Sequence, residues 1–368
     1  MKILYIANAR LPTEKAHGIQ IMKTCEAFAD LGHSVSLIVP RRFNFIKDDP
    51  FEYYRVKRNF KIIKLPTIDL VKFSKIGFWI ESIVFAKMTF LYGIIHKADL
   101  IYSRDELPIF YLSFFKKNIF WETHTGRYNF VVKHLIKRCA GIVSITNGLK
   151  DFYVKNGVDA EKIIVASDAV DIADFSKNYI QTDVRKKFGL PVDKKIILYA
   201  GRLDGWKGVE TIFKMSKFLP DEIRVVIIGG ESKQISQLKE EYPHIIFLGQ
   251  CPYRELAENL AAADALLLPN TGKNEISAHF TSPLKLFAYM ASKKPIIASE
   301  LPSLREILNE ENAYLVEPDD EFALEKTVKR VLNQKEISES KANEAYQDVQ
   351  KYTWRARANK IINFINKI

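Results

Sequence analysis

The stretch that decides the fold is residues 195–208, KIILYAGRLDGWKG. Residues 196–200 form a continuous apolar run, which predicts a strand buried on both faces. Gly201 ends that run with a residue that permits a tight turn and a close approach of backbone to a ligand. A helical pattern follows from Gly208. The stretch therefore predicts a strand, a turn and a helix, the repeating unit of a parallel α/β sheet.

The same alternation extends in both directions along the chain. Further apolar runs predict strands in the C-terminal half at 225–228, 245–248, 265–268, 295–298 and 313–316, and in the N-terminal half at 2–6, 34–39, 61–65, 100–102, 119–121 and 142–145. Helical patterns, among them 18–31, follow these runs, whereas residues 41–58 are polar and irregular. The fold class is therefore α/β, with two Rossmann-like doubly wound domains facing across a cleft.

Length and composition agree with two domains. The chain has 368 residues, and at about 100–200 residues per domain this predicts two. The polar stretch 176–187 separates the two series of strands, so we expect domains at 1–180 and 181–352. The tail from Glu336 is helical, and Tyr352-Thr353-Trp354 interrupts it before a last helix within 353–368.

The positive charge of the chain is concentrated in its first part. Residues 1–150 contain 24 Lys and Arg against 12 Asp and Glu, whereas residues 151–368 contain 31 against 32. A basic surface attracts nucleic acid, acidic lipid headgroups or phosphorylated substrates. No nucleic-acid motif accompanies the charge, so we expect no nucleic acid partner. A solvated lysine-rich surface and a contact with an anionic acceptor or membrane remain as alternatives.

Cysteine spacing and the apolar segments bear on location. The three cysteines, Cys25, Cys139 and Cys251, form no metal or redox motif, which is typical of a reducing cytoplasm. Charged residues interrupt the apolar N-terminus too early for a secretory signal. The longest apolar stretch, 76–96, holds Glu81 and Lys87 at its centre, which argues against a membrane span. It predicts a helix covering a sheet, with an interfacial membrane helix as the alternative.

Two segments carry the strongest chemical signals. In residues 201–208, Arg202 and Lys207 can bind phosphate oxygens beside a helix N-terminus, which predicts a diphosphate site. The alternative is a surface turn with two solvated cations. The turn is neither G-x-G-x-x-G nor a Walker loop, so hydride transfer and ATP hydrolysis lose support. In the second segment, TSPLKLFAYMA at 281–291, Ser282 is a plausible N-cap and Pro283 a natural first helical residue, which predicts another helix N-terminus at the cleft. The alternative is a well-capped helix without a ligand.

With these motifs in place, the chain resembles the retaining glycosyltransferases of family 4, which have the two-domain GT-B fold. The resemblance covers nearly the whole length. It rests on Gly201-Arg202 with Lys207, on 282–290, on Gly18 after the first strand, on Phe247-Leu248-Gly249-Gln250, and on Tyr352-Thr353-Trp354. In the family the last of these segments crosses back to the first domain, so the final helix is expected to pack there.

The resemblance implies a role for each matching position. Arg202 and Lys207 would hold the donor diphosphate and stabilise the leaving nucleotide, and Gln250 would lie near the base. The other donor-binding positions would be Gly18, Gly201, Ser282, Pro283, Leu284, Lys285 and Ala288. Such enzymes need no metal, and we expect no cofactor beyond a UDP- or GDP-linked sugar. The acidic pairs Asp48-Asp49 and Asp319-Asp320 fall in expected loops or helix starts, not in an Asp-x-Asp motif.

Polar residues that follow strands of the first domain are the candidates for the acceptor side. His124, after the strand at 119–121, matches a family histidine that contacts the transferring sugar, and it is the third catalytic candidate. A lone histidine of this kind is otherwise structural. Glu122 is a candidate partner of His124 or an acceptor contact. Arg104 and Asp105 are acceptor-binding candidates, with a surface ion pair as the alternative.

Ala288 departs from the family pattern. The family carries two glutamates eight positions apart, and the matching residues here are Phe280 and Ala288. The second glutamate would bind ribose hydroxyls, and losing a charged acceptor costs about 1.5–3 kcal/mol. Three interpretations compete: an engineered substitution that weakens the enzyme, a natural one that another group compensates, and an inactive relative.

We therefore predict a glycosyltransferase of hexosyltransferase type that moves a sugar from a nucleotide-diphosphate donor to a glycan or lipid-linked acceptor, with retention, in cell-envelope polysaccharide synthesis. Ala288 would impair its activity. The protein would be cytoplasmic, with peripheral contact to an anionic membrane at its inner face. The alternatives are a nucleotide-sugar-binding relative without activity and a nucleotide-sugar epimerase. Donor base, sugar, linkage and oligomeric state are not encoded in these patterns.

Overall fold

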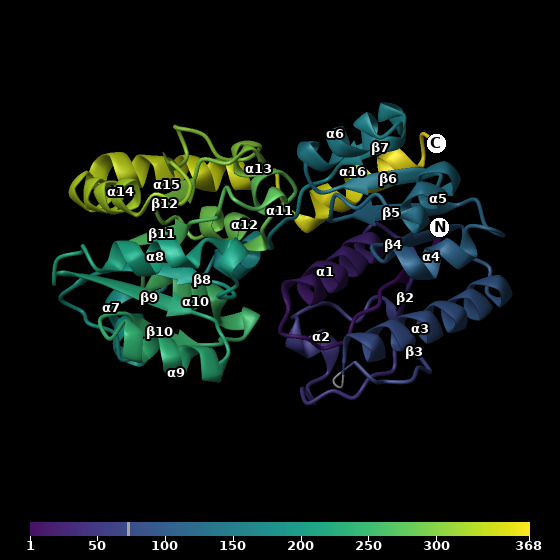
Figure 1. The fold of residues 1–368 in the computed structure, drawn as a ribbon, viewed down its shortest axis with the longest axis horizontal. Helices are drawn as coiled ribbons and strands as arrows, with labels where there is room; N and C mark the ends of the chain where they lie inside the picture. Colours follow the sequence, from purple (N-terminus) through teal and green to yellow (C-terminus); the bar gives the residue numbers. More distant parts are fainter. Residues whose placement is uncertain (72–73) are drawn as a thin grey trace. The chain divides into compact units, whose positions relative to one another are not determined.

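The chain forms two compact units in the computed structural model, which describes residues 1–71 and 74–368 (Figure 1). The first unit comprises Met1–Ser167 and Trp354–Ile368, and the second comprises Asp168–Thr353. The first unit thus ends at Ser167, whereas the sequence suggested residue 180. The reason lies in the contacts of the following segment: the Asp168 backbone N donates to Ser282 Oγ (3.0 Å), and Val170 forms a parallel bridge with Thr353.

A parallel sheet forms the centre of the first unit. Its strands, within the described residues, run in the order β3-β2-β1-β4-β5-β6-β7. They are β1 (Lys2–Ile6), β2 (Ser34–Pro40), β3 (Lys61–Leu65), β4 (Leu100–Ser103), β5 (Ile119–Thr123), β6 (Gly141–Ser144) and β7 (Ile163–Val165). The order reverses at β1, which pairs with β2 on one side and β4 on the other. Ligands bind such sheets beyond the carboxyl ends of the strands at this reversal.

Helices cover the sheet of the first unit. They are α1 (Ala16–Asp30), α2 (Pro50–Tyr53), α3 (Lys75–Ile95), α4 (Glu106–Leu112), α5 (Phe130–Arg138), α6 (Asn147–Lys155) and α16 (Trp354–Ile365), with the 3-10 turn η1 (Ala160–Lys162). Helix α16 packs against α1, and α3, α4 and α5 pack in that order (Figure 1). The edge strand β7 and the short helix α2 were not predicted, since three or four residues carry too little periodicity.

The second unit repeats the architecture with another parallel sheet. Its order, in the part of the chain that is described, is β10-β9-β8-β11-β12-β13, with the reversal between β8 and β11. The strands are β8 (Lys195–Ala200), β9 (Ile223–Ile228), β10 (Ile246–Gly249), β11 (Ala265–Leu268), β12 (Ile296–Ser299) and β13 (Tyr314–Val316). The helices are α7 (Gln181–Lys187), α8 (Val209–Ser216), α9 (Ser232–Glu241), α10 (Leu256–Ala261), α11 (Glu275–His279), α12 (Leu284–Ala291), α13 (Pro302–Arg305), α14 (Glu321–Asn333) and α15 (Lys335–Val349), with the 3-10 turns η2 (Ile172–Phe175), η3 (Gly205–Lys207) and η4 (Tyr253–Glu255).

Strand β8 shows why the predicted run is continuously apolar. Ile196, Leu198 and Ala200 pack into one core cluster, whereas Ile197 and Tyr199 pack into the cluster on the opposite face. Both faces of the strand are therefore covered, as a parallel sheet requires. The predicted fold class, two Rossmann-like doubly wound domains, is confirmed, and each predicted strand is present with its ends shifted by at most two residues.

Candidate functional site

The turn after β8 brings backbone and cations together at the carboxyl edge of the second sheet. Gly201 adopts φ +154°, and a Cβ built on it would lie 2.9 Å from Lys285 Nζ. Gly208, with φ +70°, begins helix α8, and a Cβ there would lie 1.6 Å from the Pro269 carbonyl oxygen. Both positions therefore require glycine, which fixes the path of the turn over the end of the strand.

Lys285 places a buried amine at this edge. Its Nζ is buried, has no hydrogen-bond partner among the described residues, and lies 3.9 Å from the centre of the Tyr199 ring. Burial, and then the nearby Lys207 ammonium, hold the pKa of Lys285 well below its usual range. A buried amine without a partner is unfavourable unless an anion binds it. The site is therefore built to receive negative charge.

Lys207 and Arg202 add two further cations at the same turn. Lys207 Nζ lies 3.5 Å from the centre of the Trp206 ring. Burial, aided by Arg202 and opposed by Asp204, lowers the pKa of Lys207 to about 8. Arg202 is largely exposed and pairs with Asp204 at 3.2 Å. The cations predicted from the sequence thus meet at one edge, and Lys285 joins them from the start of helix α12.

The N-terminus of α12 differs from the prediction in one respect. Pro283 is the N-cap itself, and no side chain caps the helix. The predicted capping by Ser282 is therefore wrong, because its hydroxyl instead accepts the Asp168 backbone N–H. Leu284 is the first helical residue, so its amide lies in the uncapped first turn, where an anion is favoured. Gln250 follows the end of β10 with an exposed side chain.

Ala288 lies inside the core of the second unit. It is 2% exposed and sits in the second turn of α12, three residues after Lys285. Residues three apart lie on the same side of a helix. A glutamate at 288 would therefore be buried near the Lys285 ammonium, and the alanine leaves that ammonium without a carboxylate on its own helix.

One acid of each pair considered for a metal caps a helix. Asp49 accepts from the backbone N–H groups of Phe51 and Glu52 at the start of α2, and Asp320 caps α14 in the same way. Among the described residues no group of three or more His, Cys, Asp and Glu is placed to hold a metal ion.

In the first unit, Glu122 is the centre of a buried polar cluster. It has no exposed side-chain surface and binds the Arg357 guanidinium at 2.9 Å and His124 Nε2 at 2.7 Å. Gln20 and Tyr102 also donate to its carboxylate. These donors come from α1, β4 and α16. Since Glu122 is enclosed by them, the arrangement favours its predicted role as a partner of His124 over an acceptor contact.

His124 is held as a neutral ring. Burial, and next the Arg104 charge, lower its pKa to about 4, although the bond to Glu122 opposes the shift. Burial alone would raise the pKa of Glu122, but Arg357 and the bonds from His124 and Tyr102 hold it well below its usual range. An ionised carboxylate only accepts hydrogen bonds, so Nε2 carries the His124 proton and Nδ1 is the acceptor.

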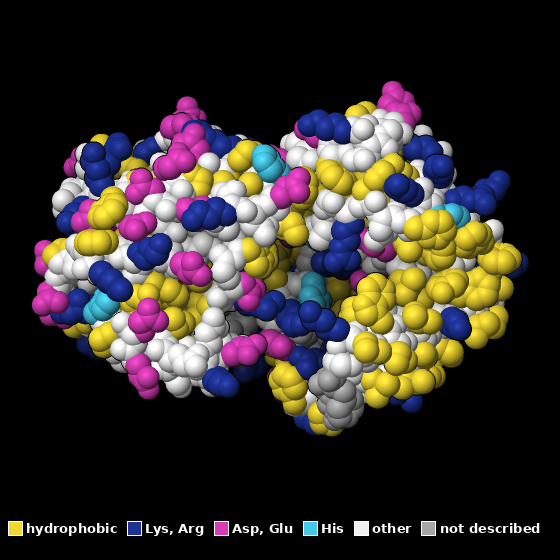
Figure 2. Space-filling view, viewed as in Figure 1, with side chains coloured by type: hydrophobic (Ala, Val, Ile, Leu, Met, Phe, Trp, Pro, Cys, Tyr) yellow, Lys and Arg dark blue, Asp and Glu magenta, His cyan; other side chains and the backbone are white. Residues whose placement is uncertain are grey.

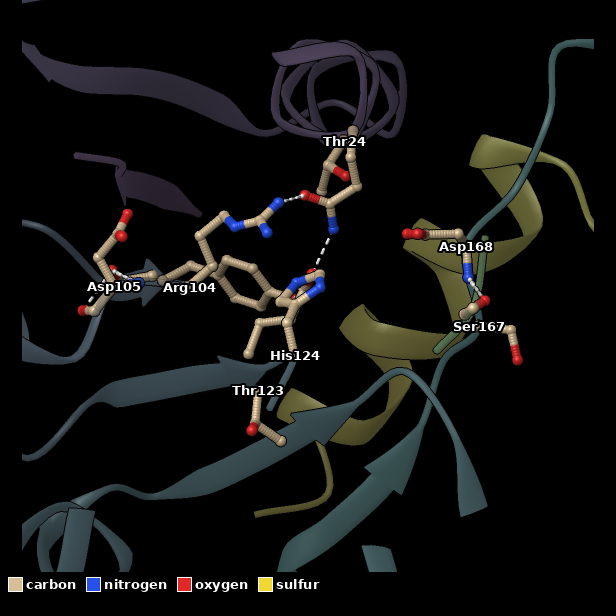
Figure 3. Close-up of polar contacts among 12 residues, drawn as sticks. Thr24, Arg104, Asp105, Thr123, His124, Ser167 and Asp168 are labelled. Carbon is tan, nitrogen blue, oxygen red and sulfur yellow. Dashed lines mark hydrogen bonds and ion pairs between the residues drawn. The ribbon is translucent and has the colours of Figure 1, made fainter. Parts of the chain in front are cut away.

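Arg104 and Asp105 follow β4 next to this cluster. Arg104 donates to Gln20 Oε1 at 2.7 Å, and Asp105 accepts the Asn8 backbone N–H at 2.7 Å. Both partners follow β1 in the chain, and the side chains of Arg104 and His124 lie close together below α1 (Figure 3). Burial raises the pKa of Asp105 from its ordinary value.

Gly18 has a packing role. It lies in the first turn of α1, where a Cβ would come within 2.1 Å of the Tyr54 hydroxyl oxygen. That hydroxyl accepts the Thr13 backbone N–H and donates to the Thr13 carbonyl, which fixes the loop before the helix. Packing against Tyr54 therefore already requires glycine at position 18. The predicted approach of Gly18 to the donor stays a prediction.

Gln20, Tyr102 and Arg357 of the cluster, and the nearby His17, were not singled out from the sequence. Arg357 comes from α16, and its Nε also donates to the Ser167 carbonyl at 3.1 Å. His17 follows Lys15 at the start of α1, and burial, with Arg104, Lys15 and other cations, lowers its pKa to about 3. A basic residue on the buried face of the last helix, and a histidine after the first strand, were the available signals.

Comparison with known proteins places the second unit in a family. Residues 180–348 match the model of the glycosyl transferases group 1. The O-antigen chain mannosyltransferase RfbU of Salmonella typhimurium is 26% identical over 242 residues, covering 64% of this chain and 61% of that protein. The D-inositol 3-phosphate glycosyltransferase of Xylanimonas cellulosilytica is 26% identical over 197 residues, covering 50% and 46%. The match thus spans about half the length of such relatives.

Solved structures agree on the fold. The structure of HepE from Anabaena in complex with UDP and glucose superposes with a TM-score of 0.81 at 14% identity, covering 100% of both chains. At this identity the likeness shows the GT-B fold. The match to the group 1 glycosyl transferases thus covers residues 180–348, and the likeness of fold covers the whole chain. Both agree with the resemblance predicted from the sequence.

Proposed function

We propose that the chain is a glycosyltransferase that takes a sugar from a nucleoside-diphosphate donor held by the second unit. The observation that carries the proposal is the buried Lys285 ammonium at the turn after β8, next to Lys207. A diphosphate would supply the charge that this ammonium lacks, with bonds worth about 1.5–3 kcal/mol each. HepE was solved with UDP and glucose, which supports a nucleotide-sugar donor.

We propose that Arg202, Lys207 and the first turn of α12 stabilise the leaving diphosphate, so that no metal is needed. Transfer would proceed with retention. The acceptor hydroxyl attacks the anomeric carbon on the face that the leaving group occupies, the bond from that carbon to the phosphate oxygen breaks, and the same oxygen takes the hydroxyl proton. Gln250 would lie beside the base.

On the acceptor side, His124 is proposed to accept a hydrogen bond from the transferring sugar through Nδ1. Glu122 fixes the tautomer that makes this possible. Arg104 and Asp105, at the end of β4, would contact the acceptor. The relatives include an O-antigen chain mannosyltransferase, which supports a glycan acceptor and polysaccharide synthesis. A lipid-linked form of the acceptor and a cytoplasmic site of action at the inner face of a membrane complete the proposal.

The test is nucleotide binding followed by turnover. UDP, GDP and their sugars are added to the full chain, and thermal unfolding is recorded. A ligand at about 100 times its dissociation constant stabilises by about 2.7 kcal/mol. Lys207→Met should abolish the response, while Lys273→Met, an exposed lysine of the same unit, should keep it. If no nucleotide stabilises the chain, the donor assignment fails.

Turnover then tests the remaining steps. Product anomers identified by NMR report retention or inversion, and chelator treatment reports the need for a metal. Ala288 favours a second candidate, a nucleotide-sugar-binding relative without activity, because the buried position offers no carboxylate to the ribose. Binding without turnover in the chain, together with turnover in Ala288→Glu, would assign the loss to residue 288.

A further inference from the structure

The outer side of helix α3 is unusually apolar for a surface. Ile76, Ile80, Ile83, Leu91 and Ile94 are exposed at helical spacing, with Ile76 at 71% and Leu91 at 52%. Side chains at such intervals share one side of a helix. By length and composition α3 could also cross a membrane.

The inner side of α3 rules out a span through the bilayer for this fold. Gly77 and Gly93 are buried, and a Cβ on them would meet the backbone of Leu70 and the side chain of Leu112 within 2.9 Å. Glu81 is fully buried and ion-paired with Arg42. The helix is therefore anchored in the first unit along one side and free along the other.

Aromatic side chains extend the exposed region over α4 and α5. The rings of Phe90 and Phe115 lie 5.4 Å apart, and Phe110 links Phe114 at 5.3 Å to Phe130 at 6.0 Å. Phe115 and Phe130 are 67% and 75% exposed. Figure 2 shows hydrophobic side chains gathered over this part of the first unit. We call it the α3–α5 face, represented by Ile76, Trp79, Ile83, Leu91, Phe115 and Phe130.

The exposed charges on the α3–α5 face are mainly positive. Helix α3 contains Lys75, Glu81 and Lys87, and the single acid is the buried one. Residues 106–150 contain seven Lys and Arg, among them Lys117 and Lys133, which are exposed. The two acids of this range are the half-buried Glu106 and the buried Glu122. A second copy of the chain would bring these cations against each other. Anionic phosphates around an apolar layer match both properties.

We propose that the α3–α5 face docks on a bilayer that carries anionic headgroups. Trp79 and Phe115 would lie at the level of the headgroups, where aromatic rings are favoured, and Lys87, in the middle of the apolar side, would extend its ammonium to a phosphate. The proposed function explains only why docking would be useful, since docking would bring the chain to a membrane-linked acceptor. The binding itself needs neither donor nor acceptor.

The experiment is sedimentation of the full chain with vesicles of phosphatidylcholine alone or mixed with phosphatidylglycerol. Binding is expected to the mixed vesicles and to weaken with salt. Trp79 is 60% exposed, so its emission should shift to the blue on binding, and Trp79→Phe should remove the shift. Ile83→Asn and Leu91→Asn should each weaken binding by about tenfold or more. Phe218→Asn and Ile337→Asn, both 48% exposed in the second unit, are the matched controls.

Three results would overturn the proposal. The chain could fail to bind either kind of vesicle, the control variants could lose as much binding as the α3–α5 variants, or the chain could form a dimer in solution that Ile83→Asn dissociates. The last result would assign the face to a second copy. Nucleotide-dependent thermal stabilisation, measured without vesicles, tests the proposed function separately, so that either can fail alone.

Discussion

Replacing Lys285 by Met is the sharpest test of the second unit. Met keeps the length of the side chain and removes the charge. The ammonium is buried without a hydrogen-bond partner among the described residues, and such a group costs about 1–3 kcal/mol, more when it is charged. The variant without ligand should therefore unfold at a higher temperature. For a domain of 150–250 residues, each kcal/mol shifts the melting temperature by about 2–4 °C.

The same change should weaken donor binding. If Lys285 donates to the diphosphate, its loss removes a charge-assisted bond worth about 1.5–3 kcal/mol, which is about a 10- to 150-fold rise in Kd. Calorimetric titration with UDP and GDP, alongside thermal unfolding, measures both effects. Lys273→Met controls for loss of a surface charge. A variant that is less stable than the parent and binds nucleotide with unchanged affinity would refute the reasoning.

Three further predictions concern Ala288 in the second unit and Arg357 and His124 in the first. Ala288→Glu restores the carboxylate that the family resemblance assigns to the ribose hydroxyls, so nucleotide-sugar affinity should rise about ten- to a hundredfold in a calorimetric titration. An unchanged affinity would separate residue 288 from the donor site. Arg357→Met leaves Glu122 buried without its guanidinium and should cost about 3–5 kcal/mol in urea unfolding. The exposed Arg355→Met should cost little, and Glu122→Gln added to Arg357→Met should recover part of the loss. The pKa of His124 is about 4 in the fold and 6.5 ordinarily, so the unfolded chain binds a proton first and stability falls as pH drops from 6.5 to 4. At about 1.4 kcal/mol per pH unit this amounts to about 3 kcal/mol, and urea unfolding of His124→Asn across that range should show a shallower fall. An equal slope in both proteins would contradict the assigned neutral ring.

Local patterns predicted the elements because the central strands, such as β1 and β8, are buried on both faces. Residues 196–200 are apolar at every position, and the structure divides them between two cores. The turn glycines after β8, Gly201 and Gly208, were likewise predictable from the sequence, since no other residue fits their backbone. Short elements were not, because β7 and α2 repeat their pattern too few times.

The parts of the candidate site that come from residues close together in the sequence were predictable. Arg202 and Lys207 are five residues apart, and the sequence alone placed both on one turn. Lys285 was predicted as part of its helix. That its ammonium lies over the Tyr199 ring of β8, without a hydrogen-bond partner among the described residues, depends on tertiary packing. The capping of α12 by Ser282 was wrong because a tertiary partner, the Asp168 amide, competes for the hydroxyl.

Long-range contacts account for what the sequence did not reveal. Glu122 meets Arg357 across more than two hundred residues of chain, and no local pattern links the two. From the sequence, Glu122 could equally well be a partner of His124 or a contact of the acceptor. Only the enclosure of Glu122 by α1, β4 and α16 distinguishes them.

Helix α16 belongs to the first unit but is the last part of it to be synthesised. The ribosome delivers the sheet of the first unit early, then the whole second unit, and only afterwards Trp354–Ile368. Domains commonly fold as they emerge, N-terminal first. Here the early sheet would close over the Glu122 carboxylate before its ion-pair partner, the Arg357 guanidinium, exists. The nascent first unit should therefore stay open around α1 until Arg357 arrives, which makes the last helix the step that completes the earliest domain.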